Sequence, residues 1–321
     1  MDCGNCYIWR VFTVESMKAG LSGALVGNAA CFVAYLIFAF NIVFCKTISN
    51  SGTISPMALF CMRSIGSAAL FWLLSLFVAR GEKIQRGDMW KVALASFLGL
   101  FLTQLAFLKA ITMCTAVDAS ILTLLSPIMA MIIAAVALKD RITANGVLGL
   151  AISLAGVVFI VLNSVGNGSG AQATTTGGVI LMLVNTLAFA SYTGIFKPVI
   201  QKYHVVTFMK WMFLFSTIYA LPFGMGALAD VPYAQIPAGI WWRVAFVVVC
   251  ATFISYFLIP IGQKRIKPMI VCMYVYVQPV GALAISLATG METMSWAKGL
   301  AALCVFLGVG IVNFSRNSKT I

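Results

Sequence analysis

Apolar residues gather along the chain into long runs that short polar stretches separate. A helix rises ~1.5 Å per residue, so about 20 apolar residues cross the ~30 Å hydrocarbon core of a bilayer. The pattern therefore predicts an all-α polytopic membrane protein with ten transmembrane helices. The ten runs are residues 27–48, 56–79, 89–111, 116–138, 144–163, 178–199, 206–227, 241–262, 268–289 and 295–314.

Composition agrees with a bilayer and leaves little room for an enzyme. Hydrophobic residues make up 62% of the 321 residues and charged residues only 9%, and eight carboxylates and one histidine serve the whole chain. The lone His204 is expected in a cytoplasmic loop, and no Gly-x-Ser-x-Gly motif occurs. Cys3 and Cys6 have metal-like spacing, but zinc needs four ligands and no second pair follows. We expect no catalytic residues, no cofactor and no metal.

The formal charge of +13 indicates topology rather than nucleic-acid binding, because Lys and Arg fall singly between apolar runs. With the N-terminus inside, cytoplasmic segments hold most of them, and only Lys46, Lys109, Arg243 and Lys298 fall outside. We therefore expect an inner (plasma) membrane protein with both termini cytoplasmic. The cytoplasmic set is Arg10, Lys18, Arg80, Lys83, Arg86, Lys91, Lys139, Arg141, Lys197, Lys202, Lys264, Arg265, Lys267, Arg316 and Lys319.

The two halves of the chain repeat each other. Pro127 precedes Asp140 by 13 residues, and Pro279 precedes Glu292 by the same 13, at an offset of 152. Five helices per copy is an odd number, so the second copy enters the membrane from the opposite side. The result is a 5+5 inverted repeat, whose halves can rock around a central site.

The repeat also predicts the organisation of the chain. We expect a cytoplasmic N-terminal segment, two repeats joined by an extracytoplasmic linker, and a cytoplasmic tail. Either Met1 or Met17 could be the true start. The segments are residues 1–26, 27–163 (helices one to five), 164–177, 178–314 (helices six to ten) and 315–321.

Motif elements along the chain are Asn41, Lys46, Arg63, Thr115-Ala116, Ala119-Ser120, Pro127 and the acidic Asp140. Together these elements resemble the EamA-like branch of the drug/metabolite transporter superfamily, over nearly the whole chain. One departure is Lys139-Asp140, where the family usually reads Gly-Glu. The resemblance implies the drug/metabolite transporter fold, a basket of helices one to four and six to nine around a central cavity, with helices five and ten outside.

Helices five and ten carry closely spaced Gly and Ala, including Gly146, Gly149, Gly299 and Gly308. Small residues let membrane helices approach closely. These helices could form a homodimer, or they could pack against their own bundle.

Polar side chains at membrane depth should face a cavity or another helix, since they are costly if unpaired. The repeat offset pairs Gln104 with Tyr256 and Ser126 with Gln278, and equivalent positions should face the same central space. Pro127 and Pro279 are expected to kink helices four and nine. The predicted substrate pathway is Asn41, Arg63, Gln104, Thr123, Tyr192, Lys210, Tyr256, Tyr274 and Gln278.

Two cations in this set have alternative roles. Arg63 lies seven residues past Pro56, about 10 Å into the core. It could hold an anionic group of a solute, snorkel to the outer surface, or bind a neighbouring helix. Lys210 is nearer its helix start, and its expected role is to snorkel to the cytoplasm.

The function favoured by these features is secondary transport of a small amphipathic metabolite by alternating access. An amino acid or a related compound, exported from the cell, fits the tyrosines and the cations of the pathway. The carboxylates lie at helix ends rather than mid-membrane, which favours facilitated diffusion or exchange over proton coupling. The alternatives are an intramembrane enzyme and a non-transporting channel or scaffold.

Overall fold

The computed structural model describes residues 4–78, 82–126, 128–129, 174–265 and 274–289, with isolated positions between 133 and 155 and between 299 and 307. Its elements are all helical, which confirms the all-α prediction for this part of the chain. They are α1 (Gly4–Asn50), α2 (Pro56–Ser75), α3 (Arg86–Ser96), π-helix η1 (Phe97–Leu102), α4 (Thr103–Met113), α5 (Ala116–Thr123), α8 (Thr176–Ile195), α9 (Lys197–Lys202), α10 (Val205–Ala229), η2 (Tyr233–Gln235), α11 (Ala238–Phe246), π-helix η3 (Val247–Ile254), α12 (Ser255–Arg265), η4 (Tyr274–Tyr276) and α14 (Val277–Ala288).

Polar residues between the apolar runs determine where several helices begin. Ser55, Thr115 and Thr175 precede α2, α5 and α8, and each side-chain oxygen accepts a hydrogen bond from a backbone N–H in the first turn. Such an N-cap satisfies one of the four N–H groups that a helix start leaves unpaired. Pro56 opens α2, where its missing N–H costs nothing.

Six helices in the described residues are long and apolar enough to cross a membrane. They match predicted helices one, two, three, six, seven and eight, while the ten-helix count remains a prediction. They are Leu25–Asn50, Pro56–Ser75, Arg86–Met113, Thr176–Ile195, Val205–Ala229 and Ala238–Arg265.

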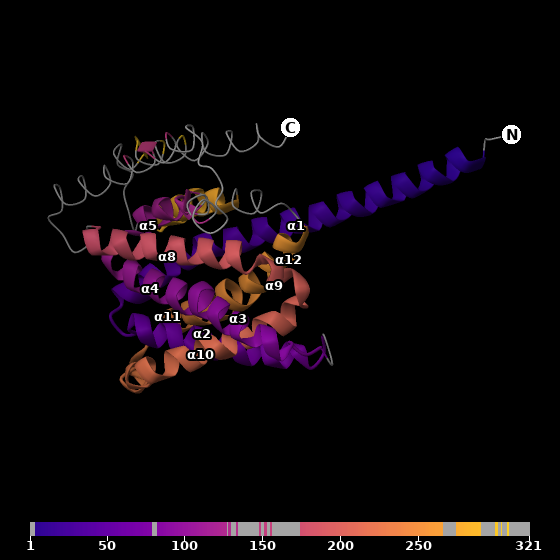
Figure 1. The fold of residues 1–321 in the computed structure, drawn as a ribbon. Coiled ribbons are helices and arrows are strands. Elements are labelled where there is room, and N and C mark those ends of the chain that lie inside the picture. The colour runs from indigo at the N-terminus through magenta and orange to yellow at the C-terminus, as the bar shows by residue number, and fades with distance from the viewer. Residues whose placement is uncertain are drawn as a thin grey trace.

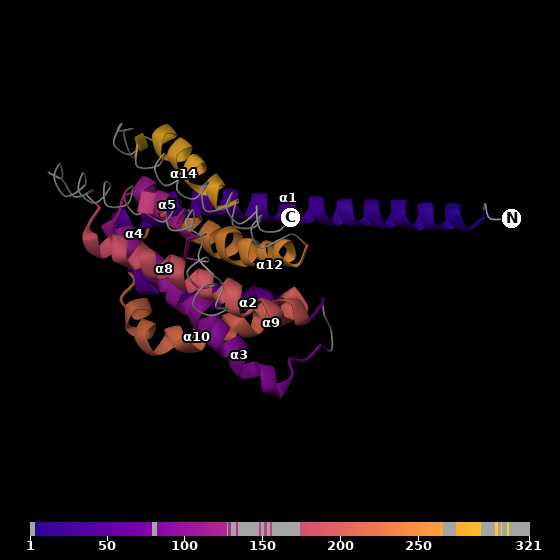
Figure 2. The same ribbon diagram turned by 45° about the horizontal axis from the view of Figure 1, so that its top comes forward.

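The helix that contains the first span is longer than the predicted apolar run. Figure 1 shows α1 as one continuous helix that extends out of the bundle towards the N-terminus, starting at Gly4 instead of residue 27. No proline interrupts residues 4–26, so nothing there breaks the backbone ladder. Predicted helices four and nine are described in part by α5 and α14, which lie beside each other (Figure 2). Predicted helices five and ten, and a dimer through them, fall outside the described residues apart from isolated positions.

The third span of each half is built from the same three segments. In the first half α3 leads into the π-helix η1 and then α4, and in the second half α11 leads into the π-helix η3 and then α12. The starts of α3 and α11, and both ends of α4 and α12, are separated by 152 residues. The repeat offset seen in the sequence therefore reappears as a repeated break in helical geometry.

One end of the bundle, the Lys46 end, is defined by contacts with the last residues of α4. Lys46 Nζ, near the end of α1, donates to the carbonyls of Ile111 at 3.1 Å and Cys114 at 2.7 Å. Thr175, just before α8, donates its N–H to the carbonyl of Met113 at 2.9 Å. Helices α1 and α4 therefore end here, and α8 begins here.

The opposite end, the Asp88 end, is where α3 begins and α9 ends. Asp88 in the first turn of α3 binds Lys202, the last residue of α9, at 2.6 Å. Lys264, near the end of α12, donates to the carbonyl of Tyr203. Thus α1 and α8 run in opposite directions, as do α2 and α10, and the third spans. The opposite directions of these described spans agree with the predicted inverted repeat, and the 5+5 arrangement of ten helices stays a prediction.

The halves meet where α2 packs along α10, which Figures 1 and 2 show side by side. The Oγ atoms of Ser64 and Ser216 are 3.2 Å apart, and the two residues are separated by the repeat offset of 152. A residue that contacts its own equivalent lies close to a two-fold axis. Nearby, a Cβ on Gly224 would overlap the Sγ of Cys61, so this glycine permits the close approach of the helices.

Candidate functional site

A cavity of about 90 Å³ lies between the two halves. Both halves contribute polar and aromatic side chains to its wall. Of the nine predicted pathway residues, Asn41, Arg63, Gln104, Thr123, Tyr256 and Gln278 line it. The remaining lining residues are Tyr35, Phe38, Ile42, Thr103, Phe107, Ser126, Asn185, Phe189 and Val275.

Arg63 is only 2% exposed and extends across to the second half. Its Nε donates to Thr252 Oγ1 at 2.9 Å, and its Nη1 contacts Cys45 Sγ at 3.9 Å. The two ion pairs found in the described residues both belong to Asp88, so none neutralises Arg63 there. This burial excludes snorkelling to the outer surface and leaves in the cavity wall a guanidinium that forms no ion pair with a described residue.

Gln104 is 3% exposed, and neither amide atom has a hydrogen-bond partner of standard geometry in the described residues. The Tyr256 hydroxyl faces this amide and lies within the electrostatic reach of Arg63. Gln104 and Tyr256 are separated by 152 residues, so the predicted pairing of these positions around one cavity is found in the structure. Leaving a buried amide unpaired costs ~1–3 kcal/mol, which makes Gln104 an unusual component of a helix interior.

The two π-helices position Gln104 and Tyr256, since each is the second residue after one of them. A π-helix shifts the hydrogen-bond ladder from i→i−4 to i→i−5 and is common at functional sites. Thr103 Oγ1 donates to the carbonyl of Leu98 at 2.6 Å, and Ser255 Oγ donates to that of Cys250 at 3.2 Å. Both contacts span five residues, and each pair occupies the equivalent position in its half.

The other amides of the wall are partly engaged. Asn185 Nδ2 donates to the carbonyl of Thr103 at 2.7 Å, and this bond joins α8 to α4 across the halves. Thr123 Oγ1 donates to Gln278 Oε1 at 3.4 Å. Asn41 Oδ1 accepts a contact from Cys45 Sγ at 3.4 Å. These amides retain hydrogen-bonding capacity toward the cavity because each has four possible bonds.

Aromatic rings complete the wall and give the cavity an apolar side. Phe38 meets Tyr256 edge-to-face, with ring centroids 6.0 Å apart. Phe107 and Phe189 come from α4 and α8. A solute with one polar end and one apolar end matches such a lining.

Tyr192 and Lys210 belong to the predicted pathway, but neither lines the cavity. Tyr192 is 2% exposed, and its ring packs so closely on Gly99 that a Cβ there would overlap it. Lys210 places its ammonium 5.0 Å from the centre of the Trp72 ring, on the outer face of α2 and α10. An apolar helix pattern could not distinguish these packing contacts from cavity positions.

Tyr274 and Pro279 also lie elsewhere than expected, while the kink predicted at Pro127 is not tested. The Tyr274 hydroxyl donates to Asn28 Oδ1 at 3.0 Å, outside the cavity lining. Pro279 is the third residue of α14, directly after the 3-10 turn η4, so it interrupts no bond within that helix. Pro127 lies outside the described residues.

The sequence analysis did not single out the aromatic wall, because an aromatic residue in an apolar run carries no polar signal. One signal was nevertheless present. Phe38 and Phe189 are separated by 151 residues, close to the repeat offset, and occupy the first helix of each half. The offset of 152 residues that paired Gln104 with Tyr256 pairs Phe38 with Ala190 instead, so finding this pair requires a shift of one residue in the first helix of each half.

The model of the EamA-like transporter family matches residues 25–162 and again residues 176–314. The chain belongs to the EamA-like transporter family. Uncharacterized transporters YetK and YyaM of Bacillus subtilis are 22% identical to it over 247 and 265 residues, covering 76% and 80% of this chain and 74% and 84% of theirs. A solved crystal structure superimposes with a TM-score of 0.62 at 17% identity, over 93% of this chain and 98% of the other. The chain is thus a multi-pass membrane transporter.

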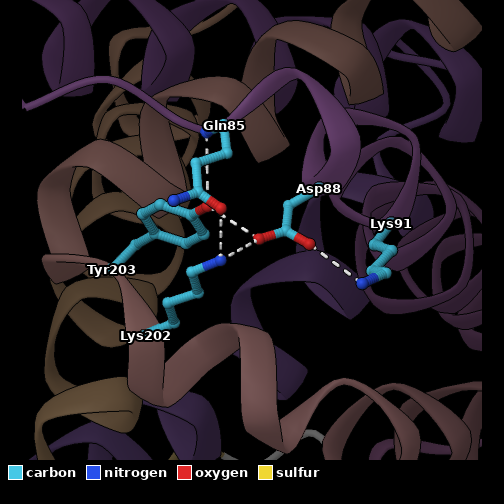
Figure 3. A network of polar contacts seen from close by, with 5 residues as sticks. All are labelled: Gln85, Asp88, Lys91, Lys202 and Tyr203. Atoms are coloured by element: carbon cyan, nitrogen blue, oxygen red, sulfur yellow. Dashed lines mark hydrogen bonds and ion pairs between the residues drawn. The ribbon is translucent and has the colours of Figure 1, made fainter.

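At the Asp88 end of this EamA-like transporter, a polar network joins the two halves (Figure 3). Asp88 Oδ2 accepts from Lys202 Nζ at 2.6 Å and from the Tyr203 hydroxyl at 2.8 Å, and Oδ1 accepts from Lys91 at 2.9 Å. The same tyrosine oxygen accepts the backbone N–H of Gln85 at 3.2 Å. The Asp88 carboxylate raises the pKa of Lys202 by stabilising its charged form.

Proposed function

We propose that this transporter carries a small amphipathic metabolite through the central cavity by alternating access. The observation that supports this most is the composition of the cavity wall. Gln104 and Tyr256, at equivalent positions of the two halves, face one space that Arg63 also lines, and Arg63 forms no ion pair with a described residue. Inverted repeats that enclose a central polar site can expose it to each side in turn.

The network at the Asp88 end supplies contacts that such a cycle would break and remake. Asp88, Gln85 and Glu82 belong to the first half, whereas their partners Lys202, Tyr203 and the N–H of His204 belong to the second. Surface ion pairs of this kind are weak, typically below ~1 kcal/mol. Contacts of that strength can hold one end closed without preventing its opening.

We place the Asp88 end in the cytoplasm and the protein in the inner (plasma) membrane, with both termini cytoplasmic. Lys83, Arg86, Lys202 and Arg265 lie at this end, outside the apolar cores of the spans. An excess of Lys and Arg in cytoplasmic loops is the usual orientation signal. The Lys46 end then faces outward, where Lys46 is 6% exposed and caps α4 rather than entering solvent.

The proposed cargo is an amino acid or a related compound, and the proposed direction is export. Arg63 suits a carboxylate, while the phenylalanines suit a side chain or hydrocarbon tail. No dedicated cofactor or catalytic group enters this proposal. Dimerisation through predicted helices five and ten is a further part of it.

The test is solute movement in vesicles that contain the purified full chain. We expect saturable flux of at least one amino acid or related metabolite above the rate in protein-free vesicles, with efflux faster than uptake. A panel of such solutes that shows no saturable flux would remove the proposal. Unitary conductance steps in a planar bilayer would indicate a channel instead.

A further inference from the structure

We propose that Arg63 and Gln104 together form a carboxylate subsite, and that the cavity selects its solute by this one negative charge rather than by an ammonium group. The inference deepens the proposed function and rests on it. It states that the cavity prefers a solute with a carboxylate over one with a neutral amide or an amine. The fold alone does not determine this preference. Three observations on the described residues support it.

The first observation is the unused hydrogen-bonding capacity of Arg63. A guanidinium has five N–H donors in a planar fork. Nε is taken by Thr252 Oγ1 and one Nη1 donor by the weak contact with Cys45 Sγ. The remaining donors meet no acceptor in the part of the chain that the structure describes. A carboxylate of the solute would supply both the missing charge and a bidentate partner.

The second observation is the unpartnered amide of Gln104. Both its Nε2 and its Oε1 are buried without a hydrogen bond of standard geometry to described residues, although the side chain lines the cavity and faces the Tyr256 hydroxyl. Nε2 can donate to a second carboxylate oxygen, and Oε1 can accept from a hydroxyl, amide or amino group next to it. The π-helix η1 ends just before Thr103 and so fixes the place of Gln104 on this wall.

The third observation is the absence of a counter-charge for a cation. None of the described residues that line the cavity is Asp or Glu. An amine entering without a carboxylate would face Arg63 with no anion to offset the repulsion, in surroundings where charges interact more strongly than in water. The amide oxygens of Asn41 and Gln278 offer an ammonium group only neutral acceptors.

The preference can be measured with four probes that share one isobutyl tail. They are 4-methylpentanoate, leucine, 4-methylpentanamide and 3-methylbutylamine, which are an anion, a zwitterion, a neutral amide and a cation. Equilibrium dialysis with the purified full chain in detergent gives the affinity for each. We expect 4-methylpentanoate and leucine to bind at least about 10-fold more tightly than the amide and the amine, because hydrogen bonds to charged groups contribute more than neutral ones.

Two variants test the assignment to these side chains. Arg63→Gln is expected to weaken binding of 4-methylpentanoate by about 10-fold or more and to remove its advantage over 4-methylpentanamide. Arg265→Gln is the matched control, since it removes the same charge from an exposed position at the end of α12 and should leave the order of affinities unchanged. Gln104→Leu loses no hydrogen bond of standard geometry to a described residue and provides a second, independent reduction in affinity if Arg63→Gln fails to fold.

The outcomes separate this inference from the proposed function. Equal or tighter binding of the amide or the amine overturns the carboxylate subsite, as does a preference that survives both Arg63→Gln and Gln104→Leu. Binding of none of the four probes overturns it too. Saturable flux of some other solute in vesicles would still support transport in each of these cases, whereas loss of all flux would remove transport itself.

Discussion

Gln104→Leu provides a sharp test of the site, because it should stabilise the solute-free protein while it weakens binding. Leucine is similar in size to glutamine and apolar, so it can occupy the same place beside Tyr256. The replacement removes no hydrogen bond of standard geometry to a described residue, and the one polar group that faces the amide is the Tyr256 hydroxyl. A buried unpaired polar group costs ~1–3 kcal/mol, so we expect the free energy of unfolding to rise by ~1–2 kcal/mol.

Asn185→Leu is the matched control. It is a buried amide of the same cavity, 9% exposed, but its Nδ2 donates to the carbonyl of Thr103 at 2.7 Å. Asn185→Leu removes the hydrogen bond to the Thr103 carbonyl. We therefore expect it to lower the free energy of unfolding by ~1 kcal/mol or more relative to the unsubstituted protein. The two amide-to-leucine changes are therefore expected to have opposite signs.

Reversible unfolding of both variants in mixed detergent micelles measures the difference, and solute binding is measured on the same samples. The reasoning would be refuted if Gln104→Leu destabilised the protein by ~1 kcal/mol or more, since the amide would then make native hydrogen bonds that the described residues do not supply. A more stable variant with unchanged affinity would show that Gln104 lowers the stability of the protein without contributing to solute binding.

Three further predictions concern the packing and the Asp88 end. Gly224→Val should lower the free energy of unfolding by ~1–3 kcal/mol, because the valine Cβ would overlap the Sγ of Cys61 where α10 packs on α2. An unchanged unfolding midpoint would contradict this close approach. Asp88→Asn should lower the free energy of unfolding by less than ~1 kcal/mol, since Lys91 and Lys202 are 40% and 44% exposed. It should also speed solute release towards the cytoplasm in a flux assay, and an unaltered release rate would show that the network does not control opening at this end. The same variant should lower the pKa of Lys202 towards its ordinary value, so that amine-reactive labelling of this lysine begins at lower pH, and an unshifted labelling profile would argue against the contact.

The sequence predicted the features that depend on spacing and hydropathy. Apolar length gave six spans that the structure also has, and the offset of 152 residues predicted that Gln104 and Tyr256 would share a cavity. Both rules follow from simple physics, since a bilayer fixes helix length and a duplicated helix keeps its inward face. The depth of Arg63 left open whether it snorkels or is buried. Neither its burial nor its partner Thr252 could be predicted, because both depend on how the halves pack.

The features that the sequence did not predict depend on local geometry and on packing. Nothing in the apolar run before Gln104 distinguishes a π-helix from an α-helix, although the break is duplicated in η3. Tyr192 was expected in the pathway on the basis of its polar hydroxyl, whereas its ring fills the space left by Gly99. Lys210 likewise lies over the Trp72 ring, a contact between two helices that no periodicity within one helix reveals.

Access to the cavity from the two sides of the membrane tests the central claim most directly. Ser126 lines the cavity and can be changed to cysteine with little change in size, in a protein whose native cysteines are replaced by alanine. We predict that a membrane-impermeant thiol reagent labels Ser126→Cys from either side, that the two accessibilities change in opposite directions when solute is added, and that excess solute protects the thiol. Labelling from one side only under all conditions, or equal changes on both sides, would contradict a site that faces the two sides alternately.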